Sequence, residues 1–163
     1  MEFRSFLIKY AEIGVKGRNR GIFEDALVRQ IRHALKRCEG EFAVRRTRGR
    51  VYVEVLSESY DYEETVEGLK TVFGIAQICP MIELKDEGFE SLCSAVVSYM
   101  GEAYPDRNLT SKVNTRRARK DYPMESMEVN SELGGVLLDA YPERKVDVHD
   151  PQVLSTINIR IKL

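Results

Sequence analysis

The sequence lacks several features that define whole classes of protein. None of its apolar runs reaches the roughly 18 residues that a membrane-spanning helix needs, and its start, MEFRSFLIKY, turns polar too early for a secretory signal peptide. Its three cysteines, Cys38, Cys79 and Cys93, form no C-x-x-C pair and leave one odd thiol, which argues against a disulfide framework or a thiolate zinc site. We therefore expect a soluble cytoplasmic protein with reduced cysteines, no bound metal and no membrane partner.

Residue patterns for catalysis are equally scarce. The two histidines, His33 and His149, have no cysteine or carboxylate at metal-ligand spacing, and no G-x-S-x-G motif lies near them. Glu63 and Glu64 are adjacent, so on a helix they do not face each other, and we interpret them as solvated surface. Because a catalytic site needs several convergent reactive groups, we predict no catalytic residue and no cofactor in this segment.

Charge is balanced overall but segregated along the chain. The formal net charge is −1, yet basic residues outnumber acidic ones by 13 to 8 in residues 1–60, and acidic residues outnumber basic ones by 10 to 3 in residues 61–108. Residues 109–163 carry 9 basic and 8 acidic residues, but 5 of these cations fall within residues 112–120. Two separate basic regions suggest a polyanionic partner, although solvated surface would give the same counts.

Apolar periodicity predicts alternating strands and helices in residues 1–85. Strands are expected in FLIKYAEI, in a hairpin around Gly49 and in IAQICPMIEL. Two helices are expected, the second closed by Gly74. Their inner faces are predicted to consist of Phe23, Leu27, Ile31 and Ala34, and of Tyr62, Val66, Leu69 and Phe73. The resulting β-α-β-β-α-β order is the ferredoxin-like arrangement, with two helices on one face of an antiparallel sheet.

The pattern restarts after the segment KDEG, which we interpret as a linker. We predict an α+β protein with an N-terminal ferredoxin-like domain at residues 1–85 and a second, α/β domain at residues 86–163. In the second domain, helices are expected around residues 89–100 and 126–140, and strands in LTSKVNTRRA, RKVDVH and LSTINIRIKL. The inner face of its second helix is predicted to be Val129, Leu133, Val136 and Ala140.

The segment GVKGRNRG lies between the first strand and the first helix and has some properties of a phosphate-binding loop. A glycine-containing turn before a helix directs backbone N–H groups outward, but the segment contains neither G-x-G-x-x-G nor the Lys-Ser/Thr of a P-loop. Lys16, Arg18, Asn19 and Arg20 remain as candidates to bind a phosphate of a larger molecule. An ordinary capped turn with solvated charges is the alternative.

The densest basic segment is KVNTRRARKDYP, at residues 112–123. If it continues a strand, Lys112, Asn114 and Arg116 lie on one face. Protection of an edge strand would explain one or two charges, but the cations continue beyond the strand, ahead of Tyr122. Because arginine pairs with phosphate oxygens and an aromatic ring can stack on a base, we predict a nucleic-acid partner and favour A-form RNA. The predicted RNA-binding residues are Lys16, Arg18, Asn19, Arg20, Lys112, Asn114, Arg116, Arg117, Arg119 and Lys120.

Two stretches resemble one known family. YAEIGVKGRNRGIFE resembles the N-terminal ferredoxin-like domain of the tRNA 4-thiouridine synthetases, the tRNA sulfurtransferases that also serve thiamine biosynthesis. KVNTRRARKDYPMESMEVNSELGGVLLD with KVDVHDP resembles the THUMP domain that follows it in that family. A THUMP domain also occurs in tRNA methyltransferases, deaminases and pseudouridine synthases, so the RNA-binding part of another such enzyme is an alternative. Because both stretches occur together in this sequence, the tRNA sulfurtransferases are favoured over the other THUMP-containing enzymes.

The resemblance implies that both domains bind tRNA, with the THUMP domain at the acceptor end and the 3′ CCA. It implies that the full-length protein is an ATP-dependent tRNA sulfurtransferase, in which an ATP-pyrophosphatase domain with an S-G-G-x-D-S loop adenylates a uridine. Some members add a rhodanese-like domain with a persulfide cysteine. This sequence contains neither the ATP-pyrophosphatase domain nor the rhodanese-like domain. ATP, a sulfur donor and a sulfur-carrier protein are therefore expected only for the full-length enzyme, and pairing into a homodimer is left open.

Two other functions fit part of the sequence. Ferredoxin-like modules also act as sensors that bind small molecules between helices or at dimer interfaces, a role that basic clusters fit poorly. A self-contained enzyme would need the reactive groups that the sequence lacks.

Overall fold

A computed structural model describes residues 3–11, 19–47 and 50–160 of the 163-residue chain. The chain divides into two compact units, one ending at Glu83 and the other beginning at Leu84. We call them the first and the second unit and describe each by itself.

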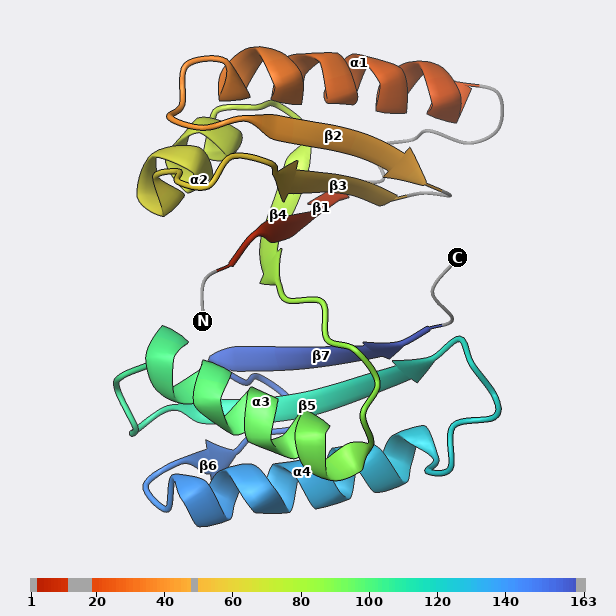
Figure 1. Ribbon diagram of the computed structural model, residues 1–163, viewed down its shortest axis with the longest axis vertical. Helices are drawn as coiled ribbons and strands as arrows, with labels where there is room; N and C mark the ends of the chain where they lie inside the picture. The colour runs from red at the N-terminus through yellow and green to blue at the C-terminus, as the bar shows by residue number, and fades with distance from the viewer. Residues whose placement is uncertain (1–2, 12–18, 48–49, 161–163) are drawn as a thin grey trace. The chain divides into compact units, whose positions relative to one another are not determined.

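The first unit is an antiparallel sheet of four strands with two helices (Figure 1). The strands are β1 (Ser5–Tyr10), β2 (Phe42–Thr47), β3 (Arg50–Val55) and β4 (Ile75–Met81), and the helices are α1 (Asn19–Leu35) and α2 (Tyr62–Lys70). The strand order is β2-β3-β1-β4, and each neighbouring pair is antiparallel. This confirms the predicted ferredoxin-like arrangement.

The core of the first unit follows the predicted periodicities. In β3 the alternation buries Val51, Val53 and Val55, which are 0%, 0% and 5% exposed. On α1, Leu27 and Ile31 are buried against these strands one helical turn apart. Because burial of apolar surface contributes about 25 cal/mol per Å², this shared face holds helix and sheet together.

The end of α2 differs from the prediction. The helix ends at Lys70, with Thr71 as its C-terminal cap, so Phe73 lies beyond it and is 81% exposed. The side chain that enters the core here is Val72, which is 8% exposed. Gly74 does not close the helix. Its φ of 93° lies in the left-handed region that favours glycine, and it forms the turn into β4.

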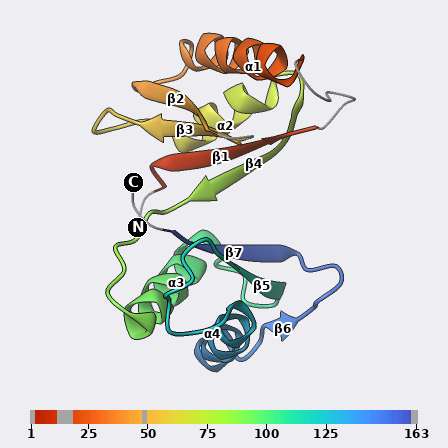
Figure 2. The same ribbon diagram turned by 90° about the vertical axis from the view of Figure 1, so that its right-hand side faces the viewer.

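The second unit is a three-stranded parallel sheet with two helices (Figure 2). Its elements are α3 (Phe89–Ala103), β5 (Thr110–Arg117), α4 (Ser126–Ala140), β6 (Lys145–Val146) and β7 (Val153–Ile159). The strand order is β6-β5-β7, and β5 is parallel to both neighbours. Both helices pack on one face of the sheet, since Met100 of α3 and Leu133 of α4 share a core with Val113 and Val153.

Two details of the second unit depart from the prediction. On α4 the third fully buried position is Leu137, 2% exposed, whereas Ala140 is exposed. The predicted strand RKVDVH is reduced to the two residues of β6, and its first residue, Arg144, has a different role. The Arg144 guanidinium is buried under the end of α3, where it donates hydrogen bonds to the carbonyls of Met100 and Tyr104 at 3.2 and 3.1 Å. It therefore satisfies the Tyr104 carbonyl at the helix end and adds a second hydrogen bond to the Met100 carbonyl, which already accepts from the Tyr104 N–H.

Two helical glycines of the second unit provide a matched test of this packing. A Cβ at Gly101 in α3 would overlap the Tyr141 hydroxyl and come within 3.3 Å of the ring carbon Cζ, while a Cβ at Gly135 in α4 meets nothing within 4 Å. We expect Gly101→Ala to lower the free energy of unfolding by about 1–3 kcal/mol, because Tyr141 must move and lose its 2.7 Å hydrogen bond to the Val97 carbonyl. Gly135→Ala should raise it by up to ~1 kcal/mol through helix propensity.

Urea unfolding of both variants measures these changes. A Gly101→Ala variant as stable as Gly135→Ala would contradict the described approach of Tyr141 to α3.

Candidate nucleic-acid interface

One face of the second sheet is left uncovered by α3 and α4, and we call it the open face. The side chains of β5 alternate across the sheet, so that Ser111, Val113 and Thr115 are buried on the helix side. The opposite side carries Lys112, Asn114 and Arg116, as predicted for this strand. The sequence pattern alone establishes this alternation, but the helices decide which side is solvated.

The neighbouring strands extend the open face with polar side chains and with one exposed apolar side chain, Leu154. The register places Lys112 beside Leu154 of β7, Asn114 beside Thr156 and Arg116 beside Asn158. On the other side of β5, Lys145 of β6 lies opposite Thr110. The contributions of β6 and β7 were missed from the sequence. The alternation in LSTINIRIKL was visible, yet the sequence does not show which strands become neighbours.

The open face is electrostatically positive. No side chain that these three described strands place on it is acidic. Arg116 has neither a hydrogen-bond partner nor an ion-pair partner among the described residues, and it is exposed. Lys112 donates one hydrogen bond, to the Val148 carbonyl at 3.0 Å, which fixes its ammonium group and leaves its charge uncompensated. The face can therefore attract an anionic backbone.

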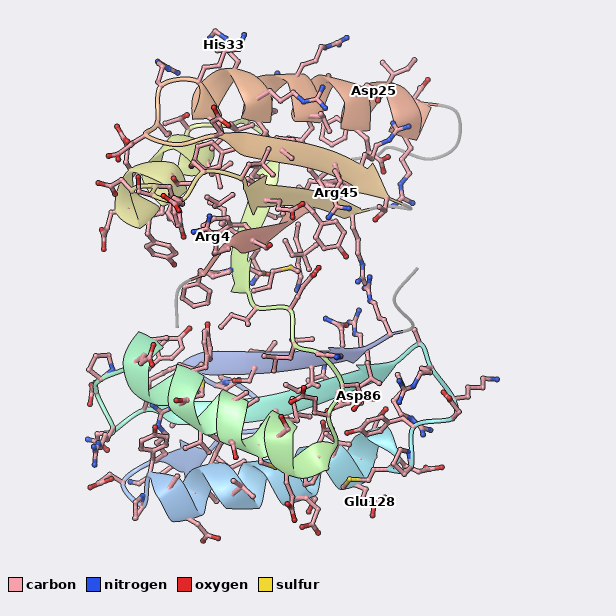
Figure 3. The ribbon with its side chains drawn as sticks, in the orientation of Figure 1. Arg4, Asp25, His33, Arg45, Asp86 and Glu128 are labelled. Atoms are coloured by element: carbon pink, nitrogen blue, oxygen red, sulfur yellow. The ribbon has the colours of Figure 1, made fainter. Side chains whose placement is uncertain are left out.

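The predicted cations at the end of β5 and beyond it do not behave alike. Arg119 binds Asp86 at 2.7 Å and Asp121 at 3.0 Å, and its guanidinium lies over the Tyr122 ring. Arg117 donates to the Met124 carbonyl at 3.0 Å. Figure 3 shows Asp86 just before α3, so these two arginines join the segment after β5 to other parts of the second unit. Among the described residues, Lys120 has no such partner.

Tyr122 does not serve as the predicted stacking aromatic. The ring is 7% exposed and is covered on one side by Arg119, so a base could not lie against it. Burial is the main reason that the pKa of Tyr122 is raised. Arg119 also contacts Asp86, and the pKa of the Asp86 carboxyl is lowered, mainly by the hydrogen bond from Arg119 and to a smaller extent by the hydrogen bond from the Gly88 N–H. Both shifts describe a structural contact.

Edge protection does not account for the open face as a whole. β5 is the middle strand of the order β6-β5-β7, although β6 pairs with it only at Thr110 and Ser111. If the charges on β5 served only to prevent aggregation of an edge strand, the neighbouring strand β7 would not need polar side chains on the same face. Instead β7 contributes Thr156 and Asn158 beside the β5 side chains.

The candidate phosphate loop of the first unit can be described only at its end. Lys16 and Arg18 lie outside the described residues. Asn19 is exposed and is the first residue of α1. Arg20 is half-exposed, and its Nε lies 3.0 Å from the Glu24 carboxylate, so it neutralises a charge of its own unit.

Glu24 is the centre of a buried ionic cluster at the start of α1. Its residue is 6% exposed, and its carboxylate accepts hydrogen bonds from Arg20 and from the Tyr10 hydroxyl and lies 3.6 Å from Arg46. Burial acts to raise the pKa of Glu24, but the hydrogen bonds from Tyr10 and Arg20 and the two guanidinium charges outweigh it, so the pKa lies below its ordinary value. For Tyr10, burial and the bond to Glu24 raise the pKa, which keeps the phenol protonated as a donor. Glu24 lies beyond the first turn of α1, which contains no acidic residue.

The described part of the chain contains no group of His, Cys, Asp and Glu side chains that could hold a metal ion. None of its helices is long and apolar enough to cross a bilayer.

Comparison with known proteins gives the class of the two units. Residues 5–79 match the ThiI ferredoxin-like domain, and residues 87–162 match the THUMP domain. The fold and the matches together define a THUMP-containing protein with a ThiI-type ferredoxin-like domain.

The relatives define the family more closely. The chain is 60% identical over 158 residues to the probable tRNA sulfurtransferase of Lachnospira eligens and 54% identical over 158 residues to that of Agathobacter rectalis; each alignment covers 97% of this chain and 40% of the relative. Among solved structures it resembles a 4-thiouridine synthetase crystallised with RNA and ATP, with a TM-score of 0.75 and 29% identity over 98% of this chain and 39% of the other. PH1313 from Pyrococcus horikoshii gives a TM-score of 0.73 and 26% identity over 97% of this chain and 51% of the other. The chain therefore consists of a ThiI-type ferredoxin-like domain and a THUMP domain, is similar to tRNA sulfurtransferases, and spans about 40% of the length of these curated relatives.

The Glu24 cluster makes acid stability testable. Because the folded-state pKa of Glu24 is lowered, its stabilisation is present above the ordinary carboxyl pKa near 4 and is lost as the pH falls through the folded-state value. We expect Glu24→Gln to lower the free energy of unfolding by roughly 1–3 kcal/mol near neutral pH, and to cost progressively less as the pH is lowered through the acidic range.

Urea unfolding at several pH values gives the measurement. Glu54→Gln is the matched control, since its partly exposed pair with Arg45 at 3.2 Å should contribute little at any pH. An equal loss for Glu24→Gln at all pH values would show that the carboxylate charge is not what stabilises the cluster.

Proposed function

We propose that this chain is the tRNA-binding part of a tRNA sulfurtransferase and that the open face contacts the tRNA backbone. The observation that carries the proposal is the acid-free face of the parallel sheet, with Lys112 and Arg116 on either side of Asn114. The relative of known structure that was crystallised with RNA resembles the chain over both units, which supports RNA as the anion.

The chemistry of the open face fits an RNA backbone. Arg116 offers a planar set of donors that matches two phosphate oxygens, and Lys112 offers a point charge. Asn114 can donate to and accept from a ribose 2′-hydroxyl, the group that distinguishes RNA from DNA. A sheet face is broad and shallow, as is the minor groove of A-form RNA, so it suits recognition of shape at the acceptor end of a tRNA.

The remaining steps belong to the part of the family that this chain does not match. In the proposed full-length protein, that part binds ATP, activates a uridine of the tRNA and transfers sulfur from a donor, with a sulfur-carrier protein as partner. The present chain holds the acceptor end and the 3′ CCA so that the uridine reaches that site. Because its substrate would be tRNA, we place the protein in the cytoplasm, and a homodimer is compatible with this role.

Removing the two cations of the open face tests the proposal. We expect Lys112→Ala with Arg116→Ala to weaken tRNA binding by about tenfold or more and to reduce the slope of log affinity against log salt by about 2, because two phosphate contacts are lost. Fluorescence anisotropy with tRNA at two salt concentrations measures both quantities. A second titration with tRNA that lacks its 3′ CCA should give weaker binding to the parent chain.

Two controls separate binding from folding. Arg107→Gln removes a cation that lies over the Tyr141 ring, away from the open face, and should leave affinity nearly unchanged. Arg119→Ala removes a cation that is bound to Asp86 and Asp121, so we expect it to lower the unfolding midpoint. Parent-like tRNA binding by the folded Lys112→Ala, Arg116→Ala variant would refute the role of the open face.

A further inference from the structure

A shallow groove in the first unit carries a second concentration of unpaired positive charge. It has a volume of about 430 Å³ and lies between α1 and the segment that follows α2. Arg29, His33 and Arg37 line one side at intervals of four residues, and Thr71 and Phe73 line the other. Figure 3 shows His33 on the side of α1 that faces away from the sheet. We call this site the basic groove.

The cations of the basic groove differ from three other arginines of the same unit. Arg20, Arg45 and Arg46 each pair with a carboxylate. Arg29 and Arg37, by contrast, have no hydrogen-bond or ion-pair partner among the described residues, and no acidic residue lines the groove. Like charges one helical turn apart repel each other. The dipole of α1 favours cations near its C-terminal end. This does not explain the position of Arg29, which lies nearly two turns before that end.

Phe73 is the second unusual feature of the basic groove. At 81% it is the most exposed large apolar side chain in the described part of the chain. The turn that buries Val72 and gives Gly74 its positive φ directs the intervening phenyl ring into solvent. A solvated aromatic ring gains nothing from packing in its own unit, so a ligand that covers it would bury apolar surface.

We propose that the basic groove binds unpaired nucleotides of an RNA strand, with a base stacked on Phe73 and phosphates held by Arg29 and Arg37. Stacking on an aromatic ring beside a positively charged groove is the general way in which proteins hold single strands. A duplex keeps its bases covered, so only unpaired nucleotides offer a free face to Phe73. The volume falls in the range of small-ligand sites and suits one or two nucleotides.

An acidic peptide would also be attracted by the charges, but it fits the ring less well. Peptide side chains gain most by entering an enclosed apolar pocket, whereas Phe73 projects as an open flat surface. The neighbouring Gln30 offers a donor and an acceptor for the edge of a base, and the Thr71 hydroxyl, which donates to the Gly68 carbonyl, can still accept. The inference extends the proposed function, since the RNA is the same molecule that the open face would contact.

The test uses the 163-residue chain and two labelled probes, a single-stranded RNA of about six nucleotides and a blunt RNA duplex of similar charge. We expect Phe73→Leu to weaken single-strand binding by roughly five- to tenfold, and Phe73→Trp to retain it because the stacking surface remains. Arg29→Gln with Arg37→Gln should weaken it by a similar factor and reduce the salt slope. Duplex binding should change less than about twofold in the Phe73 variants.

Matched controls exclude general effects. Leu56→Ser removes an apolar side chain that is 58% exposed and lies outside the basic groove, and Arg45→Gln removes a cation paired with Glu54. Both should bind the single strand as the parent chain does. Circular dichroism and thermal unfolding confirm that each variant is folded.

Several outcomes would overturn the inference. They are parent-like single-strand binding by Phe73→Leu, an equal loss on the blunt duplex, or displacement of the strand by AMP at equal nucleotide concentration. Tighter binding of a glutamate-rich peptide than of the RNA would also overturn it and would make the groove a protein-docking site. Lys112→Ala with Arg116→Ala is titrated with tRNA in parallel, so that a failure of the open face is distinguished from a failure of the basic groove.

Discussion

The one-sided covering of the parallel sheet is the constraint on which the proposed interface of the second unit depends. Because α3 and α4 both pack on the side of Val113 and Val153, the residues of β5 and β7 on that side are small or apolar, apart from Arg117 at the end of β5. The residues between them are directed away from the helices. That alternation gathers Lys112, Asn114 and Arg116 on one surface without any acidic neighbour in the three strands. Packing in the core and charge on the open face are therefore consequences of the same register.

The basic residues of the chain fall into two physical groups. Some stabilise the fold: Arg20 and Arg46 neutralise buried Glu24, Arg119 binds Asp86, and Arg144 satisfies carbonyls at the end of α3. Removing such a residue takes away a contact of the fold, and the cost appears in folding, most of all where the partner is buried, as Glu24 is. Others, such as Arg29 and Arg116, have no partner among the described residues, so their charge is available to an anion. Basic clusters in a sequence mix these two groups.

This division explains why the candidate site was only partly visible in the sequence. KVNTRRARKDYP correctly indicated a polar strand face, because alternation depends only on local geometry. It did not show that Arg117 and Arg119 bind groups of their own unit, since Asp86 is 33 residues away from Arg119 along the chain. The sequence also did not show that Tyr122 is buried and covered by Arg119, so that it cannot stack on a base. Phe73 was assigned to a helix face by periodicity, although α2 stops at Lys70 and a turn directs the ring outward.

The sequence by itself determined the order of helices and strands, the ferredoxin-like arrangement of the first unit and the family, because periodicity and motif spacing are local properties of the chain. Only the tertiary structure decided which cations are free and which strands lie beside β5. It also decided which aromatic ring remains exposed. Those properties depend on contacts between residues far apart in the chain, and such contacts form only when the helices and sheets have packed.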